Sequence, residues 1–290
     1  MAIPAWSSQF EKDAIRELRA IGPLAGITRE WAWGGSQGAR VKVAVVDSGV
    51  EAGHPAIGGA LAGSMVVELD EETDKPAARV DESRADMFGH GTACAGIVHA
   101  IAPQAEIYSV RVLGKNLTGK ANRFAEGLRW AIDEGMDVVN LSLSTSRQEY
   151  YGMFHRLADK AYFSGVTLVS AVNNRAGPSY PSLYSSVISV AASRGSDPFE
   201  YLYNPSPPVE FGAPGIDLKV AWLDGGSCVT TGNSFAAPHI SGIAALICAK
   251  HPGLTPFQLK TILFACASNT KVENDQDAQD STNVQEGLRS

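Results

Sequence analysis

Apolar runs of strand length alternate with helical patterns along most of the chain. The runs are rich in β-branched residues and apolar at nearly every position, which is typical of strands buried on both faces. Strands are predicted at 41–46, 106–113, 136–144, 165–172 and 186–192. Helices are predicted at 91–100, 121–134, 149–163, 234–250 and 256–267. Repeated strand–helix–strand units indicate an α/β fold with a mostly parallel sheet, in which ligand chemistry gathers at the carboxyl ends of the strands.

The regions outside this pattern suggest one domain with an extension at each end. Ahead of the first strand, apolar residues recur at a spacing that places them on one helix face: Phe10, Ala14, Ile15, Leu18 and Ile21. Residues 1–21 are therefore expected to form an N-terminal helical extension. Residues 22–268 are expected to be a single domain. Residues 269–290 have almost no apolar side chains, so a loose polar tail is expected there.

Charge and composition exclude several classes of function. The 290 residues include 24 Lys and Arg against 31 Asp and Glu, a formal net charge of −7, and 44% of the residues are hydrophobic. This is the composition of a globular protein, and an acidic chain lacks the broad positive surface that nucleic acids or anionic membranes attract. No apolar stretch approaches the ~18 residues of a membrane-spanning helix. We expect no nucleic-acid partner and no membrane partner.

The cysteines and the N-terminus bear on cofactors and on the compartment. Cys94, Cys228, Cys248 and Cys266 are far apart and form no CxxC pair and no Cys/His cluster, so mostly buried free thiols are expected, with no metal and no cofactor. The N-terminus lacks a basic region followed by an apolar one, which predicts no secretory signal and a cytoplasmic protein. Removal of a signal from a secreted precursor would leave the same sequence, so secretion stays open.

Three short segments place reactive side chains at the ends of predicted elements. Asp47 ends the first apolar strand, His90 lies between two glycines before a helix, and Ser234 opens an apolar helix. Each feature alone has an ordinary structural explanation, such as an Asx turn or a helix cap. Together they supply a carboxylate, a general base and a nucleophile for acyl transfer, and the helix N-terminus at Ser234 suits a negatively charged intermediate.

The order and the flanks of these residues resemble one known family. Asp47 in DSG, His90 in GHGT and Ser234 in GNSFAAPH resemble the subtilisin-like serine proteases, and the resemblance runs from about Gly22 to Ala267. It implies a three-layer fold in which helices flank a central, mostly parallel sheet. It also implies that Ser234 attacks a peptide carbonyl, that His90 transfers the proton, and that Asp47 orients and stabilises the imidazole.

The same resemblance assigns further residues of the site. In SAVNN, Asn173 stands where the family has the asparagine that donates to the oxyanion beside the Ser234 amide. The segments NLSLS and SAV look like those that line the specificity pocket and pair with the substrate backbone. The substrate-binding residues implied in this way are Ser142, Leu143, Ser144, Ala171 and Val172. Ser144 and Val172 stand where small residues are common at the pocket walls, which predicts a narrow P1 pocket.

The chain departs from the family pattern at several positions. Asn233 replaces the usual threonine before the nucleophile and brings an additional or misplaced donor beside the oxyanion, with activity expected to be retained. The loop that builds a strong calcium site in many relatives is missing after IVHA, and Ala56 replaces an expected aspartate, so no calcium is predicted there. Only about twenty residues precede the domain, too few for the inhibitory prodomain of secreted relatives, which favours an intracellular processing protease.

An acidic segment precedes the histidine motif. Residues 68–86 carry eight acidic side chains against three basic ones, which predicts a polar surface excursion. The segment ends at Asp86, four residues before His90. It either borders the substrate and favours basic substrate residues, or it is a solvated loop.

The sequence thus predicts a serine endopeptidase that cleaves peptide or protein substrates through an acyl-enzyme. One alternative is a leader peptidase or macrocyclase of a peptide natural-product pathway, in which an amine captures the acyl-enzyme. Another is a catalytically silent peptide-binding member of the family. The oligomeric state is not readable from the sequence.

Overall fold

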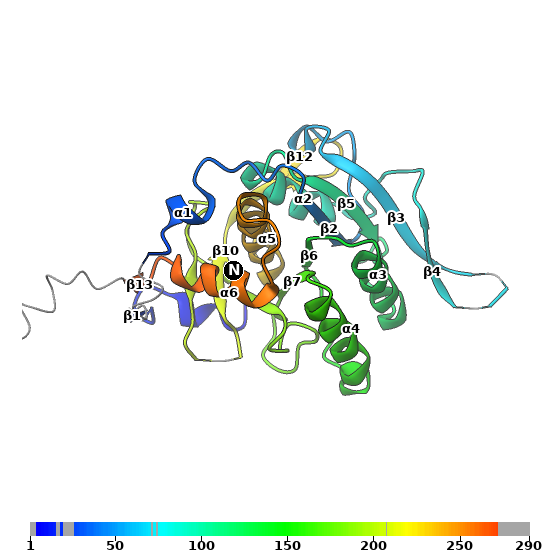
Figure 1. Cartoon of the computed structure of the whole chain (residues 1–290). Coiled ribbons are helices and arrows are strands. Elements are labelled where there is room, and N and C mark those ends of the chain that lie inside the picture. The colour runs from blue at the N-terminus through cyan, green and yellow to red at the C-terminus, as the bar shows by residue number, and fades with distance from the viewer. Residues whose placement is uncertain are drawn as a thin grey trace, which may run out of the picture.

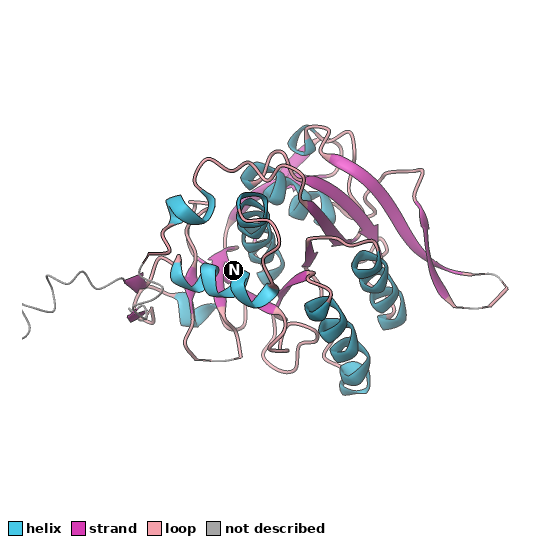
Figure 2. Ribbon diagram, viewed as in Figure 1, coloured by secondary structure: helices cyan, strands magenta, loops and turns pink. Residues whose placement is uncertain are grey.

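The computed structural model describes residues 4–15, 18–19, 26–70, 72–73, 75–206 and 208–271. Figures 1 and 2 show a large twisted sheet with helices on both sides. This arrangement confirms the predicted α/β fold with a central, mostly parallel sheet. No helix in the described ranges combines the length and the apolar character that crossing a membrane requires.

The main sheet has nine strands in the described part of the chain. In chain order they are β2 (Lys42–Asp47), β3 (Leu61–Leu69), β4 (Pro76–Val80), β5 (Glu106–Arg111), β6 (Val138–Leu141), β7 (Thr167–Ala171), β8 (Ile188–Ser193), β9 (Leu202–Tyr203) and β10 (Phe211–Pro214). Their order across the sheet is β4-β3-β5-β2-β6-β7-β8-β10-β9. The inner pairs are parallel, and the edge strands β4 and β9 run antiparallel to their neighbours. The carboxyl ends of the parallel strands therefore meet at one edge.

Helices cover the sheet from both sides. They are α1 (Arg29–Trp33), α2 (His90–Ile101), α3 (Ala121–Asp133), α4 (Tyr151–Phe163), α5 (Asn233–Lys250) and α6 (Pro256–Ala265). In β2, Val43 and Val45 pack in a core cluster with α1, α2, α5 and α6. Ala44 and Val46 pack in a second cluster with α3 and α4. Since side chains alternate between the faces of a strand, a strand covered on both faces must be apolar at every position.

The ten predicted strands and helices are present, with ends that differ by up to three residues. The sequence did not predict the hairpin of β3 and β4, or the small sheet of β11 (Leu218–Trp222) and β12 (Gly226–Thr230). Both pairs are only partly buried and contain polar residues. They therefore lack the continuous apolar runs by which the inner strands were recognised.

The described part of the N-terminal extension, residues 4–15 and 18–19, does not form the predicted helix. Ser7–Phe10 form a single 3-10 turn, η1, and residues 11–15 continue in turns. Leu18–Arg19 form a short strand, β1, parallel to β13 (Thr270–Lys271). The helical spacing was misleading because Phe10 packs against the edge of the main sheet, and such tertiary contacts override weak helical propensity.

The predicted ends of the chain are only partly visible in the described residues. Ile21 of the predicted extension lies outside them. Asn269, the first residue of the predicted tail, is buried, and residues 270–271 belong to β13. The remainder of the tail, 272–290, also lies outside the described residues.

Candidate active site

Asp47 is the last residue of β2, in the interior of the sheet. Its carboxylate is completely buried, and Oδ1 accepts a hydrogen bond of 2.7 Å from the Ser48 amide. A buried carboxylate is stable only when it is paired and hydrogen-bonded. The Asp47 carboxylate thus lies at the carboxyl edge of the sheet. This buried charge requires a partner.

His90 is that partner. It begins α2, and its Nδ1 lies 2.8 and 2.9 Å from the two carboxylate oxygens of Asp47. Gly91 makes the approach possible, because a Cβ at this position would lie 2.0 Å from the carbonyl oxygen of Gly49. The glycine after His90 thus allows the backbone of another segment to come close. The contact between His90 and Asp47 joins segments that are 43 residues apart in the sequence.

The surroundings of His90 fix its charge state. Burial acts to lower the pKa of the imidazole, but the Asp47 carboxylate stabilises the protonated form and raises the pKa well above 6.5. The Cys94 Sγ lies 4.0 Å from His90 Nδ1. Burial raises the pKa of this thiol, so it is neutral at pH 7. We therefore attribute the high pKa of His90 to Asp47.

Ser234 is the second residue of α5 and is half-buried. Its carbonyl oxygen accepts a hydrogen bond of 2.7 Å from Ser142 Oγ, which fixes the first turn of the helix against the end of β6. The ring of Phe235 lies 5.0 Å from that of His90. The first N–H groups of a helix have no intrahelical acceptor, so the Ser234 amide and the helix dipole can stabilise a nearby anion.

A cavity of about 240 Å³ brings the reactive groups together. His90 and Ser234 line it, while Asp47 lies buried behind His90. The other sequence-predicted residues in its wall are Ser142, Leu143, Ser144, Ala171, Val172 and Asn173. The sequence missed three lining residues, Leu113, Leu117 and Asn174. Leu113 and Leu117 lie in the loop after β5, which carries no motif that would have marked them.

A second cavity, of about 670 Å³, adjoins the first. The two share lining residues Leu113, Leu117, Leu143 and Ser144. The wall of the second cavity carries Lys120 and Arg147 and no acidic residue. Arg147 pairs with Glu149 at 3.4 Å, but both side chains are mostly exposed, so this pair is weak. The two cavities thus form one groove, and the part farther from Ser234 is basic.

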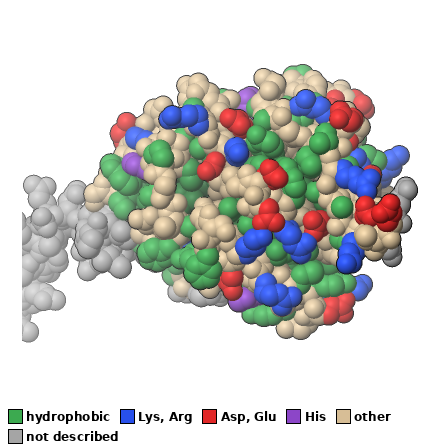
Figure 3. All heavy atoms as spheres, turned by 45° about the vertical axis from the view of Figure 1, so that its right-hand side comes forward, with side chains coloured by type: hydrophobic (Ala, Val, Ile, Leu, Met, Phe, Trp, Pro, Cys, Tyr) green, Lys and Arg blue, Asp and Glu red, His purple; other side chains and the backbone are tan. Residues whose placement is uncertain are grey.

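The acidic segment takes no part in this groove. Asp86 is buried, and its carboxylate accepts hydrogen bonds from the Gly89 amide (2.9 Å), the Thr92 amide (2.8 Å) and the Ser48 hydroxyl (2.7 Å). It therefore stabilises the start of α2 instead of bordering the substrate. Elsewhere in the segment, residues 68–69 end β3, Pro76–Val80 form β4, and Asp70 pairs with Arg79. Acidic and basic side chains are mixed on the face shown in Figure 3, so the solvated-loop interpretation is favoured.

Two neighbouring asparagines follow β7 and differ in their contacts. Asn173 Oδ1 accepts a hydrogen bond of 2.9 Å from the Arg175 amide, a contact within its own loop. Asn174 Oδ1 accepts one of 2.9 Å from the Asn233 amide, immediately before the nucleophile. Because a backbone amide can only donate, each bond identifies an Oδ1 atom and leaves the Nδ2 group of that asparagine available to another partner. Both residues line the cavity beside Ser234, so the assignment of Asn173 to the oxyanion stays a prediction.

Asn233 does not place its side chain at the oxyanion. The side chain is completely buried and makes its hydrogen bonds to backbone groups of the interior. The additional donor expected beside the oxyanion is thus already engaged inside the protein. This is consistent with the expectation that the replacement of threonine is tolerated.

Within the described residues, one group has potential metal-ligand atoms close enough to share an ion. It consists of Asp47, His90 and Cys94, with ligand atoms within 4.8 Å of one another. Asp47 and His90 already satisfy each other through the two contacts between the imidazole and the carboxylate. All four cysteines are free; Cys94 and Cys266 are buried, and Cys228 and Cys248 are half-buried. The absence of calcium near Ala56 stays a prediction.

Comparisons with known proteins agree on one family. Residues 38–285 match the model of the Subtilase family. Subtilisin DY of Bacillus licheniformis is 31% identical over 81% of this chain and 86% of its own length. The minor extracellular protease Epr of Bacillus subtilis (strain 168) is 33% identical over 82% of this chain, which spans only 36% of that protein.

Solved structures give the same result. A cold-adapted subtilisin-like serine proteinase superposes with a TM-score of 0.63 at 27% identity, covering 80% of this chain and 83% of that one. A structure described as S41 psychrophilic protease gives a TM-score of 0.68 at 27% identity, covering 82% and 86%. The chain therefore belongs to the subtilase family of serine-type endopeptidases.

Proposed function

We propose that the chain hydrolyses peptide bonds with Asp47, His90 and Ser234 as its catalytic triad. Ser234 Oγ attacks the scissile carbonyl while His90 Nε2 accepts its proton, and the imidazolium then protonates the leaving amine. Asp47 holds the proton of the imidazole on Nδ1 and stabilises the positive charge. Water then attacks the acyl-enzyme with His90 again acting as base, which releases the second product.

The observation that carries this proposal is the contact of His90 Nδ1 with both oxygens of Asp47, at 2.8 and 2.9 Å. It fixes which ring nitrogen bears the proton, so that Nε2 is left as the base. The same ring lines one cavity with Ser234 at the start of α5. The proposed base and nucleophile therefore face the same cavity, and the proposed orienting carboxylate contacts the base.

We propose Asn173 as the side-chain donor of the oxyanion hole, together with the Ser234 amide. Its Oδ1 accepts a hydrogen bond from the Arg175 amide, and Asn173 lines the same cavity as Ser234. The Nδ2 group of Asn173 is then the group available to donate to the oxyanion. Preorganised donors of this kind stabilise the tetrahedral intermediate at no cost of reorganisation.

The cytoplasmic processing role stays a prediction of the sequence. Four free thiols fit a reducing compartment, where disulfides are rare. The groove lined by both cavities fits an extended peptide segment as substrate. A processing enzyme is expected to make few cuts in an unfolded protein such as casein, and many cuts would contradict this role.

The proposed activity is tested by incubating wild-type protein and Ser234→Ala with a mixture of defined peptides, and by identifying the products by mass spectrometry. The wild type should produce a limited set of cleavages that the variant does not. Equal cleavage by both proteins would contradict the triad. An added amine nucleophile, such as glycine amide, distinguishes hydrolysis from ligation, because ligated products would exceed free acids only if the acyl-enzyme excludes water.

A further inference from the structure

A single buried side chain links the nucleophile to three separate parts of the chain. The Nδ2 atom of Asn233 lies 3.1 Å from the carbonyl oxygen of Ala5 and 3.2 Å from those of Val172 and Asn173. Its Oδ1 accepts a hydrogen bond of 2.9 Å from the Ala192 amide. The first turn of α5 is thus tied to the end of β7, to β8, and to residues at the N-terminus of the chain.

The N-terminal segment, residues 4–15, contacts the same place with its own polar groups. The Ala5 amide donates a hydrogen bond of 2.8 Å to the Asn174 carbonyl oxygen, and the buried Ser7 Oγ lies 3.5 Å from Asn233 Oδ1. Trp6, between them, has a left-handed φ of 74°, which is rare for a bulky residue. Such strain persists only where surrounding contacts over-determine the conformation, and it clusters at functional sites.

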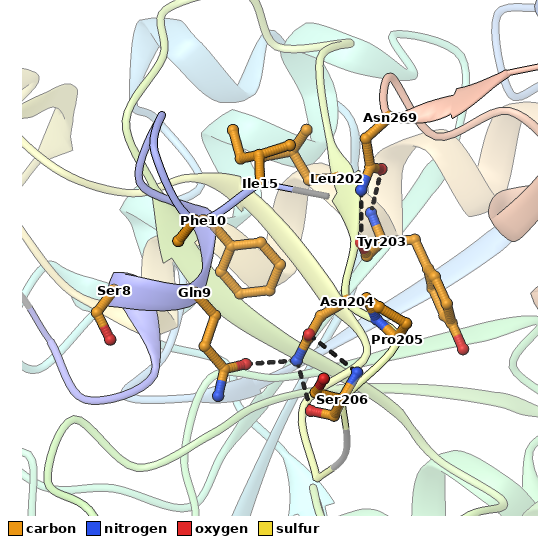
Figure 4. A pocket seen from close by; sticks show the side chains of 11 residues that line it. Ser8, Gln9, Phe10, Ile15, Leu202, Tyr203, Asn204, Pro205, Ser206 and Asn269 are labelled. Carbon is orange, nitrogen blue, oxygen red and sulfur yellow. Dashed lines mark hydrogen bonds between the residues drawn. The ribbon is translucent and has the colours of Figure 1, made fainter. Parts of the chain in front are cut away.

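Phe10 anchors the segment to the sheet. Its side chain is 3% exposed and packs with Val172, Ala191, Leu202 and Val209. Gly212 in β10 provides the space, because a Cβ there would lie 2.4 Å from the Phe10 ring. Figure 4 shows the neighbouring Gln9 hydrogen-bonded to Asn204, beside a cavity of about 280 Å³ between the segment and β9. The anchor therefore lies against Val172, directly before the two asparagines.

We propose that the N-terminal segment is a positioning element of the active site, which holds the loop after β7, with Asn173, and the first turn of α5 in the geometry that stabilises the oxyanion. The inference rests on the proposed function. Asn174 is held at its backbone carbonyl by Ala5 and at its side chain by the Asn233 amide, and Asn233 is held in turn by Ala5. The three residues form a closed set of contacts around the loop after β7.

The identity of residue 233 supports this pairing. An asparagine side chain reaches Ala5 with its amide group and the Ala192 amide with its carbonyl oxygen at the same time. The shorter threonine, with a single hydroxyl, cannot bridge the two. Residue 233 and the N-terminal segment therefore act as a unit, in which the asparagine supplies the contact that the segment uses.

Loosening the segment should lower kcat more than it raises KM. The segment contacts the oxyanion side of the site and, in the cavity wall, Val172. The groove walls formed by Leu113, Leu143 and Ser144 are built by other elements. A displacement of about 1 Å in a catalytic group can cost up to ~100-fold in rate. We expect Phe10→Ala to reduce kcat on the order of 10-fold. The substitution removes the apolar anchor and keeps every polar group through which the segment makes contacts.

The experiment measures kcat and KM of the full chain per active site, with the number of competent sites counted by titration with a fluorophosphonate. This counting separates misfolded protein from slow enzyme. Phe10→Leu, which keeps an apolar anchor, should recover most of the activity. Ser8→Ala changes an exposed residue of the same segment and should behave as the wild type. Ala5→Pro removes the amide that donates to Asn174 without touching the core, so the proposal stays testable if Phe10→Ala does not fold.

A readout specific to the oxyanion distinguishes positioning from general stability. A peptide aldehyde, which forms a tetrahedral adduct with Ser234, should lose affinity for Phe10→Ala by the same factor as kcat falls. A product peptide, which forms no adduct, should bind with unchanged affinity. Adding Phe10→Ala to Asn173→Ala should cause little further loss, because residues that act through one group are not additive.

Three results would overturn the proposal while wild-type protein remains active. They are an unchanged or increased kcat in both Phe10→Ala and Ala5→Pro, an effect confined to KM, and full additivity with Asn173→Ala. An increased kcat would identify the segment as inhibitory instead. Failure of the wild type to react with the fluorophosphonate is a different outcome, because it overturns the proposed function and the inference with it.

Discussion

The two halves of the proposed active site are built in different ways. The proton-transfer half consists of Asp47 and His90, which lie in two short motifs and meet through their side chains. The oxyanion half consists of Asn173, Asn233 and the N-terminal segment, which meet largely through backbone groups up to 228 residues apart. The first half is recognisable from residue types at fixed places. The second half depends on contacts between distant segments, which form only when the chain folds.

This difference separates two kinds of sensitivity to mutation. In the proton-transfer half, each side chain carries a chemical role that no neighbour can replace. In the oxyanion half, each contact supports the position of a donor, so single changes should have graded effects. The expected loss of activity on substitution is therefore largest in the proton-transfer half, smaller in the oxyanion half and smallest in the walls of the groove.

The largest effect is expected for Asp47→Asn. The amide would favour the wrong tautomer of His90 and would no longer stabilise the imidazolium, so kcat should fall about 10⁴-fold, the scale known for this change in another serine protease. Measurement of kcat with a chromogenic peptide checks this. Asp70→Asn in the distant hairpin is the matched control and should leave kcat unchanged. A loss of less than 10-fold for Asp47→Asn would mean that His90 is not oriented by this carboxylate.

The next effect compares the two neighbouring asparagines. Asn173→Ala should lower kcat on the order of 100- to 1000-fold, a magnitude that we carry over from the loss of such a donor in a subtilisin. Asn174→Ala should cost less, since its side chain is exposed and its oxygen only supports the Asn233 amide. Parallel kinetics of the two variants decide between them. If Asn174→Ala were the more damaging change, the assignment of Asn173 would be wrong.

A smaller effect is expected for the residue before the cleaved bond. Ser144 and Val172 line the cavity next to Ser234, so substrates with a small P1 residue should be preferred over large aromatic ones by on the order of 10-fold in kcat/KM. Ser144→Gly should reduce this preference. Efficient cleavage after Phe or Tyr by wild-type protein would contradict a narrow pocket.

The pH dependence reports on the proton-transfer half alone. Protonated His90 cannot act as a base, and Asp47 raises its pKa well above 6.5, so kcat/KM should increase with pH through a limb above pH 6.5. At pH 6.5 the activity should be less than half of its plateau. In Asp47→Asn the residual activity should show this limb at lower pH. A wild-type limb below pH 6.5 would contradict the role of the carboxylate.

The smallest effect is expected at the outer wall of the groove. Lys120 and Arg147 line the second cavity, so acidic residues several positions before the cleaved bond should be favoured over basic ones by a few-fold, and less so in high salt. Arg147→Glu should weaken or reverse the preference. Lys219→Glu makes the same change in net charge at a residue that lines neither cavity. Equal responses of the two variants would indicate a general charge effect.

The same difference explains what the sequence could predict. The inner strands were visible because both faces are covered, and the triad was visible because its side chains occur in distinctive motifs. The helix expected in the N-terminal extension was wrong, since Phe10 is buried by distant residues such as Leu202 and not by its own helix. Asp86 was considered for substrate binding because it is acidic and near His90, but it stabilises the start of α2. The spacing of residue types along the sequence does not predict contacts with such distant residues.

The loop after β7 shows the same limit at the scale of one residue. The SAVNN motif marked Asn173, but nothing in it indicated that the neighbouring Asn174 accepts a hydrogen bond from the Asn233 amide. That amide belongs to another segment of the chain, so only the folded structure reveals the contact.

The central claim is that Asp47, His90 and Ser234 form a competent triad, and the most direct test is labelling with a fluorophosphonate probe. Folded wild-type protein, Ser234→Ala and His90→Ala would be treated in parallel, and the adduct located by intact mass and peptide mapping. The triad predicts one adduct, on Ser234 of the wild type, and none on either variant. Absence of labelling in folded wild-type protein, or an adduct that persists in Ser234→Ala, would contradict it.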